Sequence, residues 1–178
     1  MQQNSNPGVK WGIVGGIVIV FLNVLTYVAG PEILFSWWNG LIQMAVFIVF
    51  AVLAGKEKKK QLGGLISFKD ALKPVFTTFI IGAAIITVYQ YILYKYIDPQ
   101  LVDALKQNLL ESTAKLLHRF KAPQEEIDKQ LDELAKTDFH VGLAKSFMDF
   151  LKLVISYFII SAIISLIIRK KPAQGQQL

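Results

Sequence analysis

The chain has 178 residues, of which 53% are apolar and only 18% charged, and its mean hydropathy is positive. This balance excludes an ordinary soluble domain, while the length favours a single domain over residues 1–178. The net charge of +6 raises the question of nucleic acid. The basic residues lie beside apolar stretches, without zinc-ligand spacing or an aromatic stacking signature, so we expect no nucleic-acid partner. Because the sequence contains no cysteine, it also excludes disulfides and thiolate chemistry.

Four apolar stretches are each long enough to cross a bilayer. They contain 19, 20, 21 and 22 residues and cover residues 11–29, 35–54, 74–94 and 147–168. A hydrocarbon core of roughly 30 Å needs about 20 helical residues. The sequence therefore predicts an all-α membrane protein with four transmembrane helices. In the first of them, Gly12 and Gly16 form a small-xxx-small step, which is typical of a helix-contact face.

The charged residues are segregated between the two ends of these spans. Ten basic and two acidic residues lie before the first span, in the loop 55–73 and after the fourth span. Residues 95–138 contain seven basic and nine acidic residues instead. Because basic residues in short loops are retained on the cytoplasmic side, we expect both termini and the loop 55–73 inside, and the insert 95–146 outside.

A turn and a helix cap are predicted in the loop 55–73. Gly63 and Gly64 indicate the turn, and Ser67 with Asp70 three residues later matches a capping box that has Asp in place of Glu or Gln. Pro74 removes a helical hydrogen bond. We therefore expect a short interfacial helix over residues 68–73 that bends at Pro74 into the third span. These residues would serve either to cap a helix end where the chain enters the membrane, or as a hinge or docking element.

The insert between the third and fourth spans predicts two amphipathic helices. Asp98 followed by Pro99 is typical of a helix start. Apolar residues recur on one face of each helix, at Val102, Leu105, Leu109, Leu116 and Phe120, and then at Ile127, Leu131 and Leu134. We expect a helical hairpin over the outer mouth of the bundle. Its apolar faces would pack internally, contact a partner, or lie on lipid, and the pattern is the same in all three cases.

Polar residues inside the spans form a first candidate site. Asn23, Gln43 and Gln90 all fall in the outer half of the predicted bundle. By helical rise, Asn23 and Gln43 lie at depths of about 9 and 12 Å, so they can share one layer. A polar group in hydrocarbon must find a partner or water. The layer would either be interhelical hydrogen bonding that fixes the bundle, or line a polar cavity for a headgroup or solute.

Charged residues at the outer end of the fourth span form a second candidate site. Lys145, Asp149 and Lys152 are spaced to share one helix face, which predicts a chain of ion pairs at the membrane interface. Lys152 can extend its ammonium group toward water. A simple interfacial anchor accounts for this pattern, and a transporter's charge relay is the alternative.

Several local features together resemble a known family. They are the GGLISF sequence at Gly63 to Phe68, the Tyr-rich exit into Ile97, Asp98 and Pro99, the acidic helical insert, and the basic close at Arg169 to Lys171. Over residues 10–171 the chain resembles an uncharacterised bacterial four-helix membrane family, domain of unknown function 4199, of Bacteroidota type. The resemblance implies the inner membrane of a two-membrane bacterium, with a periplasmic insert and cytoplasmic termini. It implies no catalytic residues, and suggests a glycosyltransferase as a partner.

The sequence contains no catalytic constellation, phosphate-binding loop or metal-ligand spacing, so we expect no enzymatic activity and no cofactor. The expected partners are membrane lipids and another protein or a second copy of the chain. We predict an inner-membrane accessory or scaffold protein that acts through helix–helix and insert contacts. The alternative is a small transporter or channel subunit with a polar cavity in its outer half.

Overall fold

A computed structural model describes residues 6–139 and 141–170, and this part of the chain is helical except for turns, connections and one isolated β-bridge. Four helices are long and apolar enough to cross a membrane: α1, α3, α7, and α4 with its extension η1. The prediction of an all-α, multi-pass membrane protein is therefore confirmed. In chain order the elements are α1 (Pro7–Ala29), α2 (Pro31–Leu34), α3 (Trp37–Gln61), α4 (Phe68–Ile92), the π-helix η1 (Leu93–Ile97), α5 (Leu101–Arg119), α6 (Gln124–Ala135) and α7 (Leu143–Ile168).

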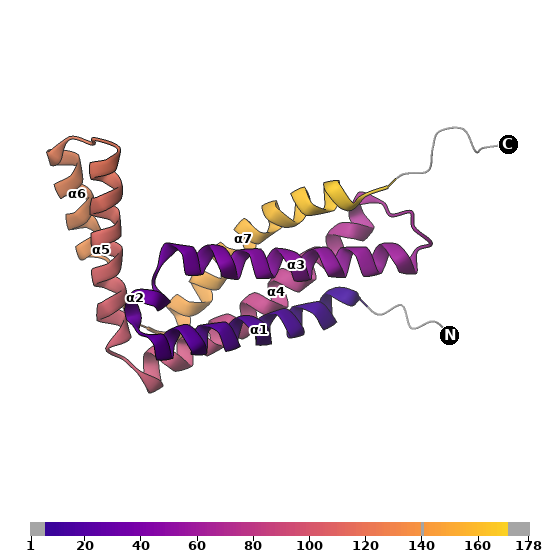
Figure 1. The fold of residues 1–178 in the computed structure, drawn as a ribbon, viewed down its shortest axis with the longest axis horizontal. Helices are drawn as coiled ribbons and strands as arrows, with labels where there is room; N and C mark the ends of the chain where they lie inside the picture. The colour runs from indigo at the N-terminus through magenta and orange to yellow at the C-terminus, as the bar shows by residue number, and fades with distance from the viewer. Residues whose placement is uncertain (1–5, 140, 171–178) are drawn as a thin grey trace.

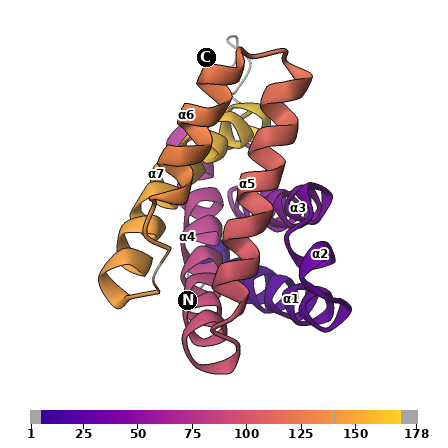
Figure 2. The same cartoon turned by 90° about the vertical axis from the view of Figure 1, so that its left-hand side faces the viewer.

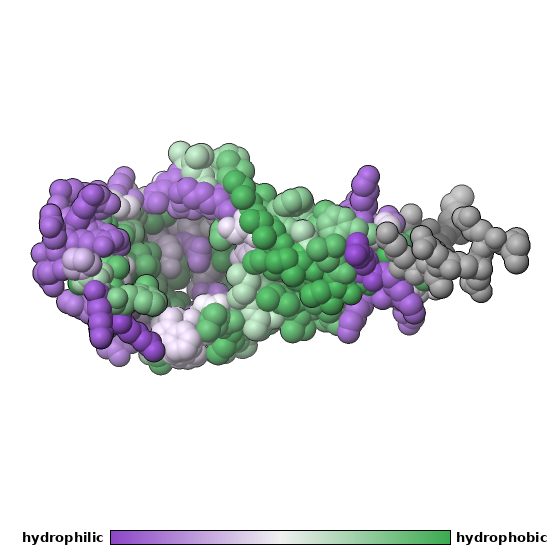
Figure 3. Space-filling model, turned by 90° about the horizontal axis from the view of Figure 1, so that it is seen from above, coloured by the Kyte–Doolittle hydropathy of each residue, from purple (hydrophilic) through white to green (hydrophobic). Residues whose placement is uncertain are grey.

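The four long helices form a bundle, and the hairpin of α5 and α6 stands across one end of it (Figure 1, Figure 2). This end is termed the insert end. The basic end is the opposite one, where α1 begins, α3 turns into α4, and α7 ends. Figure 3 shows hydrophilic surface at both ends and a hydrophobic band between them. The side of the membrane that each end faces stays a prediction.

The helices extend beyond the predicted spans. Helix α1 begins at Pro7, α3 continues to Gln61, and α7 begins at Leu143. Hydropathy marks only the hydrocarbon-crossing part of a helix, whereas Lys, Glu and Gln beyond it are good helix formers. The start of α1 is also capped, because the side chain of Asn6 accepts a hydrogen bond from the amide of Gly8.

The turn between α3 and α4 has the predicted glycines in the left-handed region. Gly63 and Gly64 have φ values of 72° and 92°. Their amides donate to the carbonyls of Lys60 and Lys59 at 3.2 and 2.9 Å. This pair of bonds is a Schellman motif, which satisfies the last carbonyls of α3. Glycine is favoured at both positions because a side chain would strain the left-handed backbone.

The predicted cap of α4 is present with a different second bond. The hydroxyl of Ser67 accepts a hydrogen bond from the amide of Asp70 at 3.2 Å, as predicted. In a capping box the carboxylate would accept a hydrogen bond from the Ser67 amide. Here the carboxylate of Asp70 accepts from the Ser67 hydroxyl instead, at 2.6 Å. The shorter Asp side chain meets the nearer hydroxyl group, so this part of the prediction is corrected.

Residues 68–73, predicted as a short interfacial helix that bends at Pro74 into the third span, are the first turns of α4, and the bend itself stays a prediction. Helix α4 runs without interruption from Phe68 through Pro74 to Ile92. Pro74 lies in the second turn of α4. It has no backbone N–H, so the helix loses one hydrogen bond there, the one to the carbonyl of Asp70. Pro74 is fully buried. A Cβ added to Gly8 of α1 would lie 2.3 Å from the carbonyl oxygen of Pro74, so the two backbones are in close contact. Packing against the glycine surface of α1 therefore holds this turn within one helix.

Glycines allow α1 and α4 to approach closely. An added Cβ at Gly12 would lie 2.8 Å from the Cβ of Ile81 and 3.0 Å from the carbonyl oxygen of Thr78. At Gly16 it would lie 3.2 Å from the Cα of Gly82. These distances are shorter than side chains tolerate, so α1 approaches α4 this closely only because it has no Cβ atom at Gly12 and Gly16. The predicted contact face at Gly12 and Gly16 is confirmed.

An aromatic cluster fills the centre of the bundle. Phe47 of α3, Phe79 of α4 and Tyr157 of α7 are buried, with ring centroids 4.9 to 5.8 Å apart. Rings at these separations attract each other in addition to the area they bury. The cluster therefore joins three of the four long helices in the middle of the bundle.

Contacts at the basic end connect segments that are distant in sequence. Glu57 of α3 accepts from the ammonium of Lys10 at 2.6 Å and from the indole of Trp11 at 2.7 Å. Ile66 and Lys170 form a two-bond antiparallel bridge, both bonds 3.1 Å long. The bridge holds the residues before α4 against the residues after α7. This end of the bundle is thus closed by polar contacts between all four long helices and their connections.

At the insert end, helix α5 begins two residues later than the motif at Asp98 and Pro99 predicts. The amide of Asp98 donates to the carbonyl of Leu93 at 2.8 Å, which completes the π-helical turn of η1. The carboxylate of Asp98 accepts from the Tyr27 hydroxyl at 3.4 Å. Asp98 therefore ends the preceding helix, and the first residue of α5, Leu101, packs on Leu34 and Leu93 instead.

Candidate functional site

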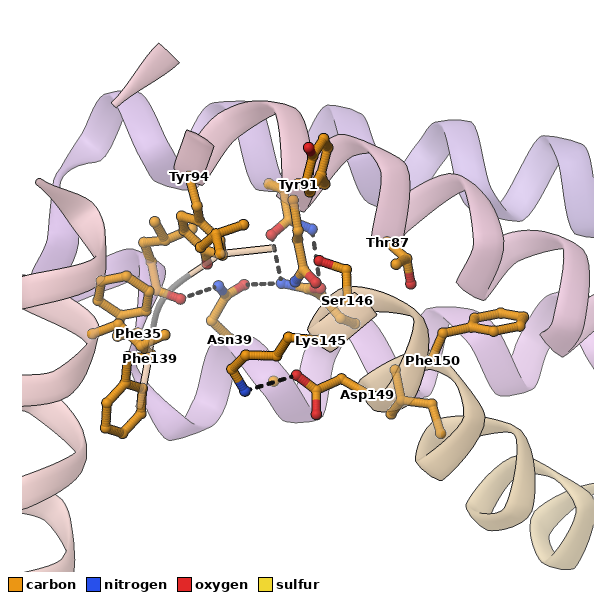
Figure 4. Close-up of a pocket in the computed structure, with 18 of the residues that line it drawn as sticks. Phe35, Asn39, Thr87, Tyr91, Tyr94, Phe139, Lys145, Ser146, Asp149 and Phe150 are labelled. Carbon is orange, nitrogen blue, oxygen red and sulfur yellow. Dashed lines mark hydrogen bonds and ion pairs between the residues drawn. The ribbon is translucent and has the colours of Figure 1, made fainter. Parts of the chain in front are cut away.

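A cavity of about 510 Å³ opens at the insert end, between α3, α4, α7 and the start of α5 (Figure 4). We refer to it as the polar cavity. The hollow between the hairpin and the bundle is visible in Figure 3. Its polar lining brings the two predicted sites together in one place, since it contains Asn23, Gln43, Gln90, Lys145 and Asp149. The sequence suggested a polar cavity as one of two roles for Asn23, Gln43 and Gln90, but it did not indicate that Lys145 and Asp149 line the same space.

Three amides form a hydrogen-bonded chain along one side of the polar cavity. The Asn23 amide group donates to the Gln43 oxygen at 3.0 Å and to the carbonyl of Ile19 at 2.9 Å. Gln43 donates to the Asn39 oxygen at 3.2 Å, and Asn39 donates to the carbonyl of Leu34 at 2.8 Å. Asn23 and Asn39 are buried. This chain joins α1 to α3, which agrees with interhelical hydrogen bonding as the role of Asn23 and Gln43.

Gln90 of α4 lines the same cavity and takes no part in this chain. Among the described residues, no side chain or carbonyl is hydrogen-bonded to the Gln90 amide or to the Ser146 hydroxyl, although both line the cavity. The predicted layer is thus divided: two of its amides satisfy each other, and the third stands open to the cavity. The open groups can bind a ligand.

The predicted ion-pair chain on α7 forms at the mouth of the polar cavity. The carboxylate of Asp149 accepts from the ammonium groups of Lys145 and Lys152, each at 3.1 Å. Figure 4 shows Lys145 and Asp149 facing the space in front of Asn39. The Lys145 and Asp149 side chains are 40% and 47% exposed, so a ligand in the cavity can reach both. The three groups together carry a net charge of +1.

The aromatic cluster lies beyond the polar cavity, toward the basic end. Phe47 lies one helical turn beyond Gln43, and Tyr157 lies one turn beyond Leu153, both on the side toward the basic end. Phe47, Phe79 and Tyr157 are buried and packed together, and none of them lines the cavity. The arrangement suits binding from the insert end.

The third predicted group lies at the basic end, away from the polar cavity. Gly63, Gly64, Ser67, Asp70 and Pro74 form the Schellman motif, the cap and the second turn of α4 described above. Their observed contacts are those of helix termination and initiation, which is the simpler of the two predicted roles. The hinge or docking role stays a prediction.

Two sets of residues line the cavity that the sequence did not single out as a site, namely Asn39 and the pair Phe139 and Val141. Asn39 lies four residues before Gln43, so the spacing indicates that they share a helix face, and this signal would have placed Asn39 in the layer. Phe139 and Val141, from the segment before α7, also line the cavity. They lie in an irregular connection, where no periodic pattern predicts which way a side chain points.

The model of the family described as "Protein of unknown function (DUF4199)" matches residues 10–170. The chain belongs to this family. The match begins at Lys10 in α1, extends past the end of α7, and includes the insert and every residue of the candidate sites. The family inferred from the sequence is confirmed, and the Bacteroidota origin stays an expectation. No curated protein and no solved structure matches the chain.

Proposed function

We propose that this DUF4199 protein is an accessory or scaffold protein of the bacterial inner membrane, which binds a partner protein through its insert. Residues exposed at the end of the α5–α6 hairpin support the proposal. The side chains of Leu116 and Phe120 are 54% and 75% exposed, and they lie one turn apart beside the connection to α6. We refer to these two residues as the hairpin tip.

The rest of the hairpin is packed differently from its tip. Ile127 of α6 is 1% exposed, and Leu131 and Leu134 are half-buried. Leu101, at the other end of α5, is buried against the bundle. The hairpin tip projects beyond α3 (Figure 1), so its apolar side chains are not covered by the bundle. A large aromatic residue exposed on a polar hairpin is typical of a contact surface.

The charge of the hairpin favours protein over lipid as the occupant of this surface. Acidic and basic residues are mixed along both helices, with ion pairs such as Lys115 to Glu111 and Lys136 to Asp132. An amphipathic helix that adsorbs to anionic lipid has a predominantly basic polar face instead. A glycosyltransferase, or a second copy of the chain, would be a partner of suitable location.

The proposal is tested by photo-crosslinking in cells. A photoreactive amino acid at Phe120 is expected to capture one defined protein, and Phe120→Ser is expected to weaken recovery of that protein with the intact chain. The matched control places the same photoreactive residue at Glu125, which is exposed in the first turn of α6. Capture of lipid alone at Phe120, or equal capture at both positions, would refute the scaffold function.

A small transporter or channel subunit is the second candidate, and the polar cavity favours it. Gln90 is the cavity amide that stands open, and solute would enter from the insert end. Transport would require the aromatic cluster at Phe47 to separate. Because the chain has no cysteine, Gln90→Cys provides a single thiol. A membrane-impermeant thiol reagent should label it from the side of the insert, and protection from labelling would exclude a wet cavity.

A further inference from the structure

A second, apolar space adjoins the polar cavity. It has a volume of about 510 Å³ and lies between α4 and α7. We refer to it as the apolar groove. Its lining includes Val88 and Ile92 of α4 and Leu143 and Phe147 of α7, all exposed on the surface of the bundle. These helices cross a membrane, so the groove faces acyl chains.

The polar cavity and the apolar groove share a wall. Thr87, Tyr91, Ser146 and Phe150 line both spaces. In Figure 4, Thr87 and Phe150 lie on one side of Ser146, and Asn39 and Lys145 lie on the other. A polar space and an apolar groove that meet at one wall match the two parts of an amphiphile, with a headgroup in the cavity and a chain in the groove.

The charge at the junction selects the headgroup. Lys145 and Lys152 both pair with Asp149, so two ammonium groups share one carboxylate and one positive charge remains. The Lys145 ammonium is a strong donor to phosphate oxygens. The open Gln90 amide and the Ser146 hydroxyl are further donors in the same cavity. This set complements a headgroup with one negative charge.

The polar cavity meets the apolar groove at the membrane depth where the phosphate of a bilayer phospholipid lies. Lys145 is the third residue of α7, a helix that crosses the membrane, so its ammonium lies at the interface where phosphate groups lie. From there the groove follows α7 inward along Phe147 and Phe150. A lipid in the leaflet at the insert end can therefore enter sideways, without leaving the bilayer.

We propose that the polar cavity and the apolar groove together bind one anionic phospholipid, with its phosphate beside Lys145 and an acyl chain along the groove between α4 and α7. This site goes beyond the proposed scaffold function and is separate from the hairpin tip, so either can fail while the other holds. The lipid would fill the space between α4 and α7 and support the α5–α6 hairpin above it.

The test is a lipid titration of the detergent-purified full chain, followed by native mass spectrometry. The probes are dioleoyl phosphatidylglycerol, dioleoyl phosphatidylethanolamine and dioleoylglycerol, which share acyl chains and differ in the headgroup. Phosphatidylglycerol is expected to bind about tenfold more tightly than dioleoylglycerol, the ratio that one charge-assisted hydrogen bond supplies. Phosphatidylethanolamine is expected to bind more weakly than phosphatidylglycerol. Equal binding of all three would overturn the proposal.

Two variants locate the lipid. Lys145→Ala is expected to weaken phosphatidylglycerol binding about tenfold, and its matched control is Lys136→Ala, which breaks an ion pair of the same spacing on α6. Ala84→Phe fills the groove, and its control is Ile17→Phe on the exposed surface of α1. Ala84→Phe should weaken binding of phosphatidylglycerol and of dioleoylglycerol equally, because the two lipids share their acyl chains. Equal affinities for each variant and its control, with all four folded by circular dichroism, would refute the site.

Discussion

Replacing Gly12 by Ala is expected to destabilise the protein, although alanine is the better helix former. The new Cβ would lie 2.8 Å from the Cβ of Ile81 and 3.0 Å from the carbonyl oxygen of Thr78. One of these atoms is backbone and the other is the first atom of a side chain, so neither can rotate away. Helix α1 must therefore move away from α4, and overpacking of this kind costs about 1–3 kcal/mol.

Helix propensity partly offsets this cost, since alanine is favoured over glycine by about 1 kcal/mol in a helix. Gly40→Ala separates the two effects. Gly40 is also helical, in α3, and an added Cβ there has no atom within 4 Å. Gly40→Ala should therefore leave stability unchanged or raise it by up to about 1 kcal/mol. Gly12→Ala is expected to be less stable than Gly40→Ala by about 1–3 kcal/mol.

The assay is reversible unfolding in mixed micelles, followed by circular dichroism as the fraction of denaturing detergent rises. Both variants and the unchanged protein are measured in the same lipid and detergent, because bound lipid also shifts apparent stability. If Gly12→Ala unfolds at the same point as Gly40→Ala, or later, the close approach of α1 and α4 is not a constraint on the fold, and the reasoning from the glycine contacts is refuted.

Three further outcomes are expected. Ser67→Ala removes the cap of α4 and should lower the free energy of unfolding by about 1 kcal/mol, measured in the same assay. A double-mutant cycle of Asn23→Ala and Gln43→Ala should give a coupling free energy of about 1 kcal/mol, because the two amides bond each other. The hydrogen bond from Lys136 to Asp132 raises the pKa of Lys136. Asp132→Asn should therefore lower that pKa, as measured by NMR titration of the lysine side chain.

Each of these outcomes has a contradicting result. For the cap, Ser67→Asp should keep most of the stability, since aspartate also accepts from the amide three residues on. Equal loss in Ser67→Asp and Ser67→Ala would rule out capping as the cause. Additive effects of the two amide variants, within about 0.3 kcal/mol, would mean that the amides do not interact. An unchanged Lys136 titration in Asp132→Asn would contradict the exposed ion pair.

The sequence by itself determined the class of the protein and the order of its elements. Four apolar stretches of about 20 residues predict membrane-crossing helices. Inside a bilayer the backbone amides and carbonyls must be hydrogen-bonded within the segment, and an α-helix does this without a partner strand. The residues that act locally were also predictable. Gly63 and Gly64 form a turn and Ser67 caps a helix because capping and turn chemistry depend on neighbours within a few residues.

Where local signals compete, the sequence was insufficient. Pro74 predicted a bend after a short helix over residues 68–73, whereas the structure has one uninterrupted α4 in which Pro74 packs against Gly8, distant in the chain. Asp98 predicted the start of α5, but its amide completes the preceding π-helical turn. For Pro74 the deciding contact is with a distant segment, whereas for Asp98 a backbone bond to Leu93, five residues back, competes with the predicted helix start.

The tertiary structure alone decided which polar residues share a space. Asn23, Gln43 and Gln90 were all placed in the outer half of the bundle, yet the fold bonds the first two and leaves Gln90 open in a cavity that Lys145 also lines. Helical periodicity gives depth and face, but the rotation of one helix against another depends on packing between them. The glycine contacts of α1 with α4 and the aromatic cluster set those rotations here. The polar cavity and its groove are therefore properties of the packed bundle and of no single segment.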